Sequence, residues 1–278
     1  MKKIITPNLD GRRKILIYGD GGVGKTVLAC SAHLVEKYKG IFLIAVEEGY
    51  ASAVKIVKEK FPIYQIDNLY EMEEVVEWLR KREQAQRYFS QAKTENDKKK
   101  YKDILIKQEE QISPQPVKEP TIIKTIVVDS LTRFQRMAMG EVTNDSDSLK
   151  VVNLKKSQYD DWGKNKKLLR NLINLLFGLK SYNIICTALS KIEDVNGVQK
   201  LIPDVEGGFK NEIGGFFDIV GFMSKEYQPL KKQTNKVIYW DDLATIAKNR
   251  LIAIRQPEDT KLINPTMESI EQQIQTNK

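Results

Sequence analysis

The sequence has few of the side chains on which many catalytic and metal-binding sites depend. It contains one histidine, His33, and two cysteines, Cys30 and Cys186. A single histidine excludes histidine-based metal clusters and argues against a Ser-His-Asp triad, so we expect His33 to be a packing residue of the first helix. Two cysteines far apart in the chain indicate buried thiols in a reducing compartment rather than a disulfide framework.

Long apolar runs and targeting segments are also lacking. No apolar run approaches the roughly 20 residues that a membrane span needs. The first residues, Met1 to Pro7, are too short and too quickly interrupted for a signal peptide. The hydrophobic fraction of 41% is nevertheless enough for 278 residues to bury a core. We therefore expect a cytoplasmic protein that has no membrane partner.

Positive charge exceeds negative charge in this chain. There are 45 Lys and Arg residues against 37 Asp and Glu residues, which gives a formal net charge of +8. A basic balance favours nucleic acid as a partner. The same excess arises when lysines are simply spread over a solvated surface, so charge alone does not decide between the two interpretations.

A glycine-rich stretch at residues 19–26, GDGGVGKT, matches G-x-x-x-x-G-K-[ST] without a mismatch. An apolar run typical of a buried strand precedes it, and a run of good helix formers follows it. Such a loop directs backbone N–H groups and the positive end of a helix dipole at one point, where phosphate binds. A glycine-rich turn that arose by chance would not be expected to have both a strand before it and a helix after it. We predict that ATP is bound by Gly19, Asp20, Gly21, Gly22, Val23, Gly24, Lys25, Thr26 and Val27.

Two side chains of this stretch have a predicted role in the chemistry. Lys25 can reach the β- and γ-phosphates, and the Thr26 hydroxyl can hold Mg²⁺. Glycines are needed around them because a Cβ would block the close approach of the backbone to phosphate oxygens. ATP and Mg²⁺ are therefore the predicted cofactors.

Apolar runs alternate with helical patterns along most of the chain. This alternation predicts an α/β fold with a mostly parallel central sheet, helices on both faces and the ligand at the carboxyl ends of the strands. A short helix is expected in the tail, residues 264–278, and Asn196-Gly197 predicts a hairpin turn whose arms are residues 191–195 and 198–202. The predicted strands span residues 14–18, 41–46, 62–66, 122–129, 183–189, 217–223, 236–240 and 244–247.

A highly charged segment interrupts this pattern from about Arg80 to Gln108 and ends in the proline-containing stretch 113–116. We interpret residues 80–118 as a charged helical insertion within a single ATPase domain that spans residues 1–278. The insertion could contact a protein partner, but a solvated helical hairpin would have the same composition.

Asp129 closes a run of apolar residues, as an acid that holds Mg²⁺ through water should. It could instead cap the helix that begins beside it. Because Ser130 rather than glutamate follows, the catalytic base must come from another strand. Glu47 follows the strand 41–46 at the same edge of the sheet, where a glutamate can polarise the attacking water. Glu48 is the alternative, although alternation directs it to the other side.

Several classes of P-loop protein lack a required part. No Asn-Lys-x-Asp follows the later strands, so nothing supports guanine specificity. No Leu-Ser-Gly-Gly is present, which argues against a subunit of an ABC transporter. Asp20 stands where partitioning ATPases of the ParA type carry a second lysine.

Five elements occur in order between Lys14 and Arg250: the glycine loop, Glu47 after a strand, and the segments 127–132 (VVDSLT), 161–163 (DWG) and 247–250 (AKNR). Together they resemble the phage-type RecA-like ATPases that are grouped as an AAA domain family of nucleotide-binding proteins. The resemblance implies a RecA-like fold and a role in DNA recombination or single-strand annealing. It also implies self-association in a filament or ring, and the host cytoplasm if a phage encodes the chain.

Lys248 and Arg250 resemble the Lys-x-Arg element of the DnaB and RadA families, whose two cations enter the neighbouring subunit's site. The resemblance implies that they act in trans beside the predicted catalytic groups Glu47 and Lys25, although a pair of surface charges would look the same. RecA recombinases place a glutamine at the end of the strand that matches 183–189. Here either Thr187 or Ser190 makes a weaker hydrogen bond to the γ-phosphate, or the relay is absent.

The resemblance also implies that two segments line a path for single-stranded DNA, residues 141–158 and 191–215. The second segment contains acidic residues as well as lysines, so it is not a clean basic patch. Lys231, Lys232 and Lys236 form a more basic cluster, on a hairpin whose placement the sequence leaves open. A loop that contacts another partner is the alternative to a DNA loop.

We therefore predict an ATPase, slow or stimulated by DNA, that assembles head-to-tail and acts on single-stranded DNA; a single-strand DNA-binding protein is a further candidate partner. A nucleotide-gated adaptor that binds protein partners through residues 80–108 is the alternative. A small-molecule kinase is a third.

Overall fold

The computed structural model describes residues 11–142, 159–195, 197–205, 209, 212–242, 244–252 and 254–276. Its strands are β1 (Lys14–Gly19), β2 (Ile41–Ala45), β3 (Ile63–Gln65), β4 (Thr125–Asp129), β5 (Asn183–Val195), β6 (Val198–Pro203), β7 (Ile219–Gln228), β8 (Gln233–Tyr239), β9 (Lys248–Asn249) and β10 (Lys261–Ile263). Its helices are α1 (Lys25–Cys30), α2 (Ala51–Val57), α3 (Leu69–Gln91), α4 (Glu95–Glu110), α5 (Leu131–Val142), α6 (Tyr159–Gly178), α7 (Ile213–Phe216) and α8 (Met267–Gln275).

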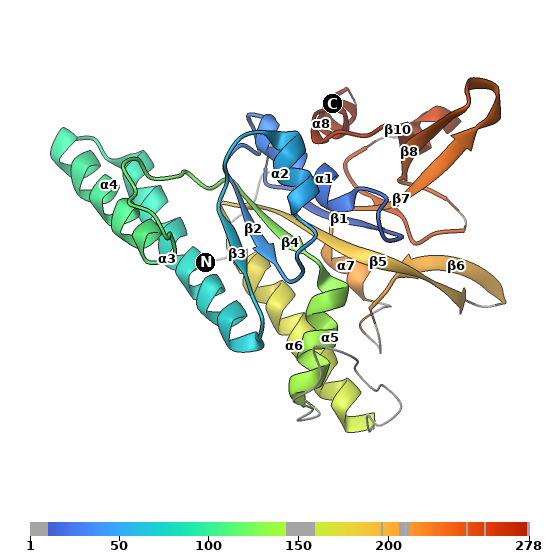
Figure 1. Cartoon of the computed structure of the whole chain (residues 1–278), viewed down its shortest axis with the longest axis horizontal. Coiled ribbons are helices and arrows are strands. Elements are labelled where there is room, and N and C mark those ends of the chain that lie inside the picture. The colour runs from blue at the N-terminus through green and yellow to red at the C-terminus, as the bar shows by residue number, and fades with distance from the viewer. Residues whose placement is uncertain are drawn as a thin grey trace, which may run out of the picture.

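Within these residues the strands form one ten-stranded sheet (Figure 1), in the order β10-β8-β7-β1-β5-β4-β2-β3, to which β6 and β9 are attached. The strands from β7 to β3 are parallel to their neighbours, whereas β8 and β10 extend the sheet in antiparallel fashion. The central sheet is therefore mostly parallel. This confirms the predicted α/β class with a mostly parallel central sheet.

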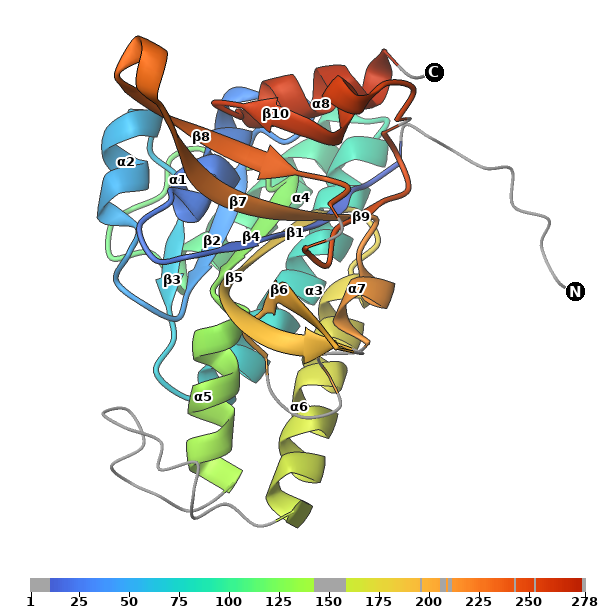
Figure 2. The same ribbon diagram turned by 90° about the vertical axis from the view of Figure 1, so that its right-hand side faces the viewer.

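Helices cover both faces of the sheet, with α1, α2 and α8 on one face and α3, α5 and α6 on the other (Figure 2). Strand β1 explains how one sequence serves both faces. Ile15 and Ile17 belong to the apolar cluster on the α1 face, while Leu16 and Tyr18 belong to the cluster on the opposite face. Because successive side chains alternate, a continuous apolar run fits a strand that is covered on both sides.

The predicted insertion at residues 80–118 has no boundary at residue 80. Helix α3 runs without interruption for 23 residues, and α4 packs against it as the second arm of a helical hairpin. Asn68 caps α3 by accepting a hydrogen bond of 2.9 Å from the Glu71 N–H. The buried Arg82 joins the two arms, because its Nη2 lies 2.7 Å from Glu109 Oε2. The hairpin is thus part of the packed structure.

Other boundaries also differ from the sequence-based prediction. The strand expected at 183–189 and the hairpin arm expected at 191–195 form one continuous strand, β5, and its antiparallel pairing with β6 confirms the two predicted hairpin arms. Residues 244–247 form no strand within the described part of the chain; Thr245 makes only an isolated bridge to Leu201. Asn196 lies outside the described residues. Strand β10 was not predicted, whereas α8 confirms the short helix that was expected in the tail.

Helix α8 is joined to the sheet through one buried carboxylate. Glu271 lies 3.2 Å from Arg13 Nη2 and 2.7 Å from Lys37 Nζ, and it accepts a hydrogen bond of 2.6 Å from the Tyr38 hydroxyl. Burial raises the pKa of Glu271, but the hydrogen bonds from Lys37, Tyr38 and Arg13 outweigh that effect and lower the pKa below its usual value. The ionised form is the one that holds this helix in place.

The rare residue types lie in the interior, as expected. His33 is buried beside Phe61 and lies 3.2 Å from Glu59, so it is a packing residue. Cys30 and Cys186 are free and buried, and burial raises the pKa of the Cys30 thiol to about 12. In the described part of the chain, no helix combines the length and the apolar character that crossing a membrane requires.

Candidate nucleotide-binding site

The glycine loop connects the end of β1 at Gly19 to the start of α1 at Lys25. Gly22 and Gly24 have φ values of 72° and 104°, a backbone region that residues with a Cβ rarely adopt. The Lys25 ammonium donates hydrogen bonds to the carbonyl oxygens of Gly19 (2.9 Å) and Asp20 (2.8 Å). The lysine therefore folds back over its own loop, where a phosphate group would sit.

The charge of Lys25 is balanced by carboxylates at the same edge of the sheet. Burial lowers the pKa of Lys25 below its usual value, and the negative charges of Asp129, Glu47 and Asp20 offset part of this effect. These three acids come from β4, from the end of β2 and from the glycine loop. The fold thus brings the predicted phosphate and metal groups to one place.

Asp129 is the last residue of β4, and its carboxylate lies between two hydroxyl groups. Thr26 Oγ1 donates a hydrogen bond of 2.8 Å to Oδ2, and Thr187 Oγ1 of β5 donates a hydrogen bond to Oδ1. Burial raises the pKa of Asp129, and the hydrogen bonds from Thr187 and Thr26 act in the opposite direction. Thr187 was expected only as a candidate γ-phosphate sensor, and its contact with the acid was not predicted.

The residues present fit Mg²⁺. Hydroxyl and carboxylate oxygens are the ligands it prefers, and it is usually held by one or two protein groups together with substrate phosphates and water. Thr26 and Asp129 supply such a pair of oxygens within 2.8 Å of each other. Among the described residues, no three His, Cys, Asp or Glu side chains gather to form a metal site of their own. The oxygen pair and the lack of further protein ligands both agree with a site in which nucleotide phosphates complete the coordination of Mg²⁺.

Glu47 lies two residues beyond Ala45, which pairs with Asp129 in the register of β2 and β4. Its Oε1 accepts a hydrogen bond of 2.8 Å from the Ser130 hydroxyl. The glutamate is therefore oriented toward the edge that carries Asp129 and Lys25. Glu47 and Glu48 are both exposed, but no hydrogen bond or ion pair joins Glu48 to the described part of the chain.

Ser190, the other candidate sensor, donates a hydrogen bond to Asp20 Oδ1 in the glycine loop. The two candidates therefore have different partners: Thr187 contacts the acid of β4, and Ser190 contacts the loop. Asp20 was predicted only as a loop residue, and its side chain now links the loop to β5.

Lys248 and Arg250 lie at the opposite end of the sheet. Lys248 pairs with Val220 near the start of β7 and donates a hydrogen bond of 2.7 Å to the Gly214 carbonyl. Arg250 lies 4.0 Å from Asp218, whose carboxylate accepts a hydrogen bond from the Lys14 N–H at the start of β1. At about 3.3 Å per residue, β1 separates this end from the glycine loop by roughly 17 Å. Neither cation reaches the loop of its own chain.

The two predicted DNA segments are only partly described. Residues 143–158, 196, 206–208 and 210–211 lie outside the described residues. Within the β5–β6 hairpin, Lys191 lies 4.0 Å from Asp204, which also binds Arg136 at 2.8 Å. The mixed charge that the sequence indicated is thus present in the hairpin. The cluster at 231–236 is divided: Lys231 and Lys232 lie at the turn after β7, whereas Lys236 reaches the glycine loop.

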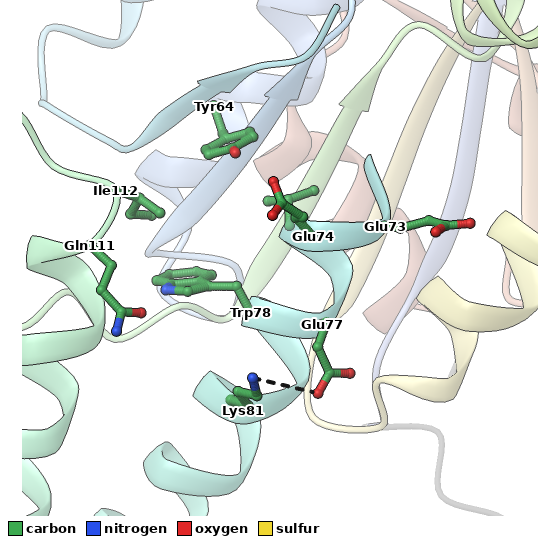
Figure 3. Close-up of a pocket in the computed structure, with 9 residues that line it drawn as sticks. Tyr64, Glu73, Glu74, Glu77, Trp78, Lys81, Gln111 and Ile112 are labelled. Carbon is green, nitrogen blue, oxygen red and sulfur yellow. Dashed lines mark ion pairs between the residues drawn. The ribbon is translucent and has the colours of Figure 1, made fainter. Parts of the chain in front are cut away.

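A pocket lies far from this site in the fold, between β3, α3 and the end of α4. Figure 3 shows Tyr64, Trp78 and Ile112 around it, together with Glu73, Glu74 and Glu77. Only one basic side chain lines it, Lys81, and its ammonium lies 3.9 Å from Glu77. Three carboxylates would repel a triphosphate, so this pocket is not the nucleotide site.

The fold and these contacts define a P-loop nucleotide-binding protein. A family described as AAA domain matches residues 12–251, and the chain belongs to this family. No curated protein matches the chain. Among solved structures, it is similar to the flagellar accessory protein FlaH from Methanocaldococcus jannaschii, with a TM-score of 0.39 and 9% identity, over 91% of this chain and 85% of that chain.

Proposed function

We propose that this protein is a Mg²⁺-dependent ATPase. The observation that carries the proposal is the contact of Thr26 with Asp129 at 2.8 Å, at the sheet edge where Lys25 folds over the glycine loop. Glycine loop, lysine, hydroxyl and acid are the parts that P-loop proteins use to hold a triphosphate and its metal. Membership of the AAA domain family supports nucleotide binding by these residues.

Each residue has a defined role in the proposed reaction. Backbone N–H groups of the loop and the Lys25 ammonium bind the phosphates and stabilise the charge that develops on the γ-phosphoryl group. Thr26 and Asp129 would hold Mg²⁺, which neutralises phosphate charge when bound. Glu47, oriented by Ser130 at 2.8 Å, accepts a proton from the attacking water.

We further propose that the substrate of the ATP-driven work is single-stranded DNA, in recombination or annealing. The net charge of +8 and the RecA-like motifs of the sequence support this proposal. It implies a head-to-tail assembly and, for a phage-encoded chain, the host cytoplasm as its location.

The first experiment measures ATP hydrolysis with and without single-stranded DNA, together with DNA binding over a range of salt concentrations. We expect stimulation by DNA and a steep fall of affinity with salt, because each neutralised phosphate releases a counterion. Hydrolysis without stimulation, combined with no DNA binding at low salt, would leave the ATPase proposal intact and overturn the DNA proposal. A protein partner bound independently of salt would then favour the nucleotide-gated adaptor.

A mixing experiment tests whether Lys248 and Arg250 complete a neighbouring subunit's site. We expect the Lys25→Ala variant and the Lys248→Ala/Arg250→Ala variant each to be inactive. An equal mixture of the two variants should regain about a quarter of the wild-type activity. In a heterologous assembly with random order, about a quarter of the interfaces join a subunit with an intact loop to a neighbour with intact cations. The Lys231→Ala/Lys232→Gly variant, changed at the turn after β7, controls for loss of charge. Full activity in the Lys248→Ala/Arg250→Ala variant alone would contradict the proposal.

A further inference from the structure

Lys236 of β8 lies against the glycine loop, although it is more than 200 positions away in the sequence. A Cβ placed on Gly24 would lie 2.8 Å from the Nζ atom of Lys236 and 3.3 Å from its Cε atom. Gly24 directly precedes Lys25 and is the residue from which α1 starts. The glycine therefore leaves the space in which the second ammonium group sits.

The sheet register explains how Lys236 comes to this position. Gly19 pairs with Met223 of β7, and Met223 pairs with Ile238 of β8. Lys236 lies two residues from Ile238 on the same face of β8, and Ile238 belongs to the apolar cluster on the α1 face. Since β8 is antiparallel to β7, Lys236 lies beyond the end of β1, at the level of the loop.

The backbone of Lys236 is fixed by Asn264, which follows β10. The Lys236 N–H donates a hydrogen bond of 3.1 Å to Asn264 Oδ1, and the Asn264 N–H donates one of 2.6 Å to the Lys236 carbonyl. The half-buried side chain is thus placed by two strands that the predicted site did not include.

The ammonium group of Lys236 has no ion-pair partner among the residues that the structure describes. Its cross-strand partner in the register is Lys225, and like charges directly opposite each other destabilise a sheet. Within the described residues, neither of these two lysines forms an ion pair or a side-chain hydrogen bond. An ammonium group held at an anion-binding loop without a carboxylate partner fits a ligand that brings negative charge.

We propose that Lys236 is a second phosphate-binding lysine of the nucleotide site, supplied by the same subunit as the loop. The proposal rests on the proposed function, namely that the loop binds a nucleoside triphosphate. Glycine-rich loops of this kind hold the α- and β-phosphates, while their own lysine reaches the β- and γ-phosphates. Lys236, beside Gly24, contacts the phosphates that ATP and ADP share. Lys236 therefore contributes to the binding of both nucleotides and not to the rate of hydrolysis.

The test compares dissociation constants of Mg-ATP, Mg-ADP and adenosine for the wild type and for Lys236→Ala. We expect Mg-ATP and Mg-ADP to bind about tenfold more weakly, because a charge-assisted hydrogen bond is lost, and adenosine binding to be unchanged. The maximal hydrolysis rate at saturating ATP should change less than twofold, since the contact is equal in substrate and transition state. Lys180→Ala, the same substitution at an exposed lysine between α6 and β5, should bind like the wild type.

Thermal unfolding without nucleotide separates a binding role from a structural one. We expect Lys236→Ala to unfold at the wild-type temperature or above it, because the substitution relieves repulsion by Lys225. Lys236→Arg should retain most of the nucleotide affinity. Wild-type affinity in Lys236→Ala, or a loss that Lys236→Arg shares in full, would overturn the inference. Failure of the wild type itself to bind nucleotide would instead overturn the proposed function.

Discussion

Replacing Glu47 by glutamine is expected to lower the ATP turnover rate by about 10²- to 10⁴-fold, the range that general acid–base catalysis contributes. The amide cannot accept the proton of the attacking water, yet it keeps the hydrogen bond from Ser130. Binding of Mg-ATP should be as tight as in the wild type or tighter, because a negative charge that repels the triphosphate is removed. Steady-state turnover and equilibrium binding measured on the same preparation check both parts.

Glu48→Gln is the matched control for this prediction. It removes the same charge one position along the chain, from a side chain that is exposed like Glu47 but does not share its hydrogen bond from Ser130. We expect a change of less than about twofold in turnover, since a carboxylate without contact to the reacting atoms contributes little. If Glu48→Gln abolished turnover and Glu47→Gln did not, the base would be assigned to Glu48.

Replacing Glu271 by alanine is expected to destabilise the folded protein by about 3–5 kcal/mol, the range for removing one partner of a buried ion pair. The substitution leaves Arg13 buried without its carboxylate and removes the acceptor of the Tyr38 hydroxyl. Urea unfolding, followed by circular dichroism, measures the change. Glu268→Ala, at an exposed position in the first turn of α8, should cost only about 0.5 kcal/mol through the helix dipole.

The same carboxylate predicts how stability depends on pH. The pKa of Glu271 is lowered in the folded state, so its contribution is fully present above the unfolded pKa and is lost as the pH falls through the folded pKa. Glu271→Gln should therefore show a weaker loss of stability on acidification than the wild type. Equal pH dependence of the two proteins would show that this group does not contribute.

The central part of the site could be predicted because its signals are local. The glycine loop, the strand before it and Asp129 at the end of an apolar run are each read within about ten residues of sequence. Parallel strands bring their carboxyl ends to one edge, so the proximity of Asp129 and Glu47 follows from the fold class alone. Their contacts with Thr187 and Ser130 depend on side-chain geometry that no motif contains.

Lys236 could not be placed from sequence, because its position depends on how distant strands pair. The basic character of residues 231–236 and their place on a hairpin could be predicted, but nothing local shows that β7 pairs with β1 and that β10 follows β8 in the sheet. Register errors of one residue would have turned Lys236 to the other face. The continuity of α3 through Arg80 was missed for a related reason: an increase in charge was interpreted as a boundary, although no helix-breaking residue accompanies it.

The placement of Lys248 and Arg250 at one end of β1, and of the glycine loop at the other, gives each subunit a front and a back. If the cations serve the adjoining molecule, a row of subunits with free ends always includes one loop that no neighbour completes. In a closed ring every glycine loop has a neighbouring subunit that supplies the two cations, so no loop is left incomplete. Whether the assembly is an open row or a closed ring would then determine how many of its glycine loops can support ATP hydrolysis.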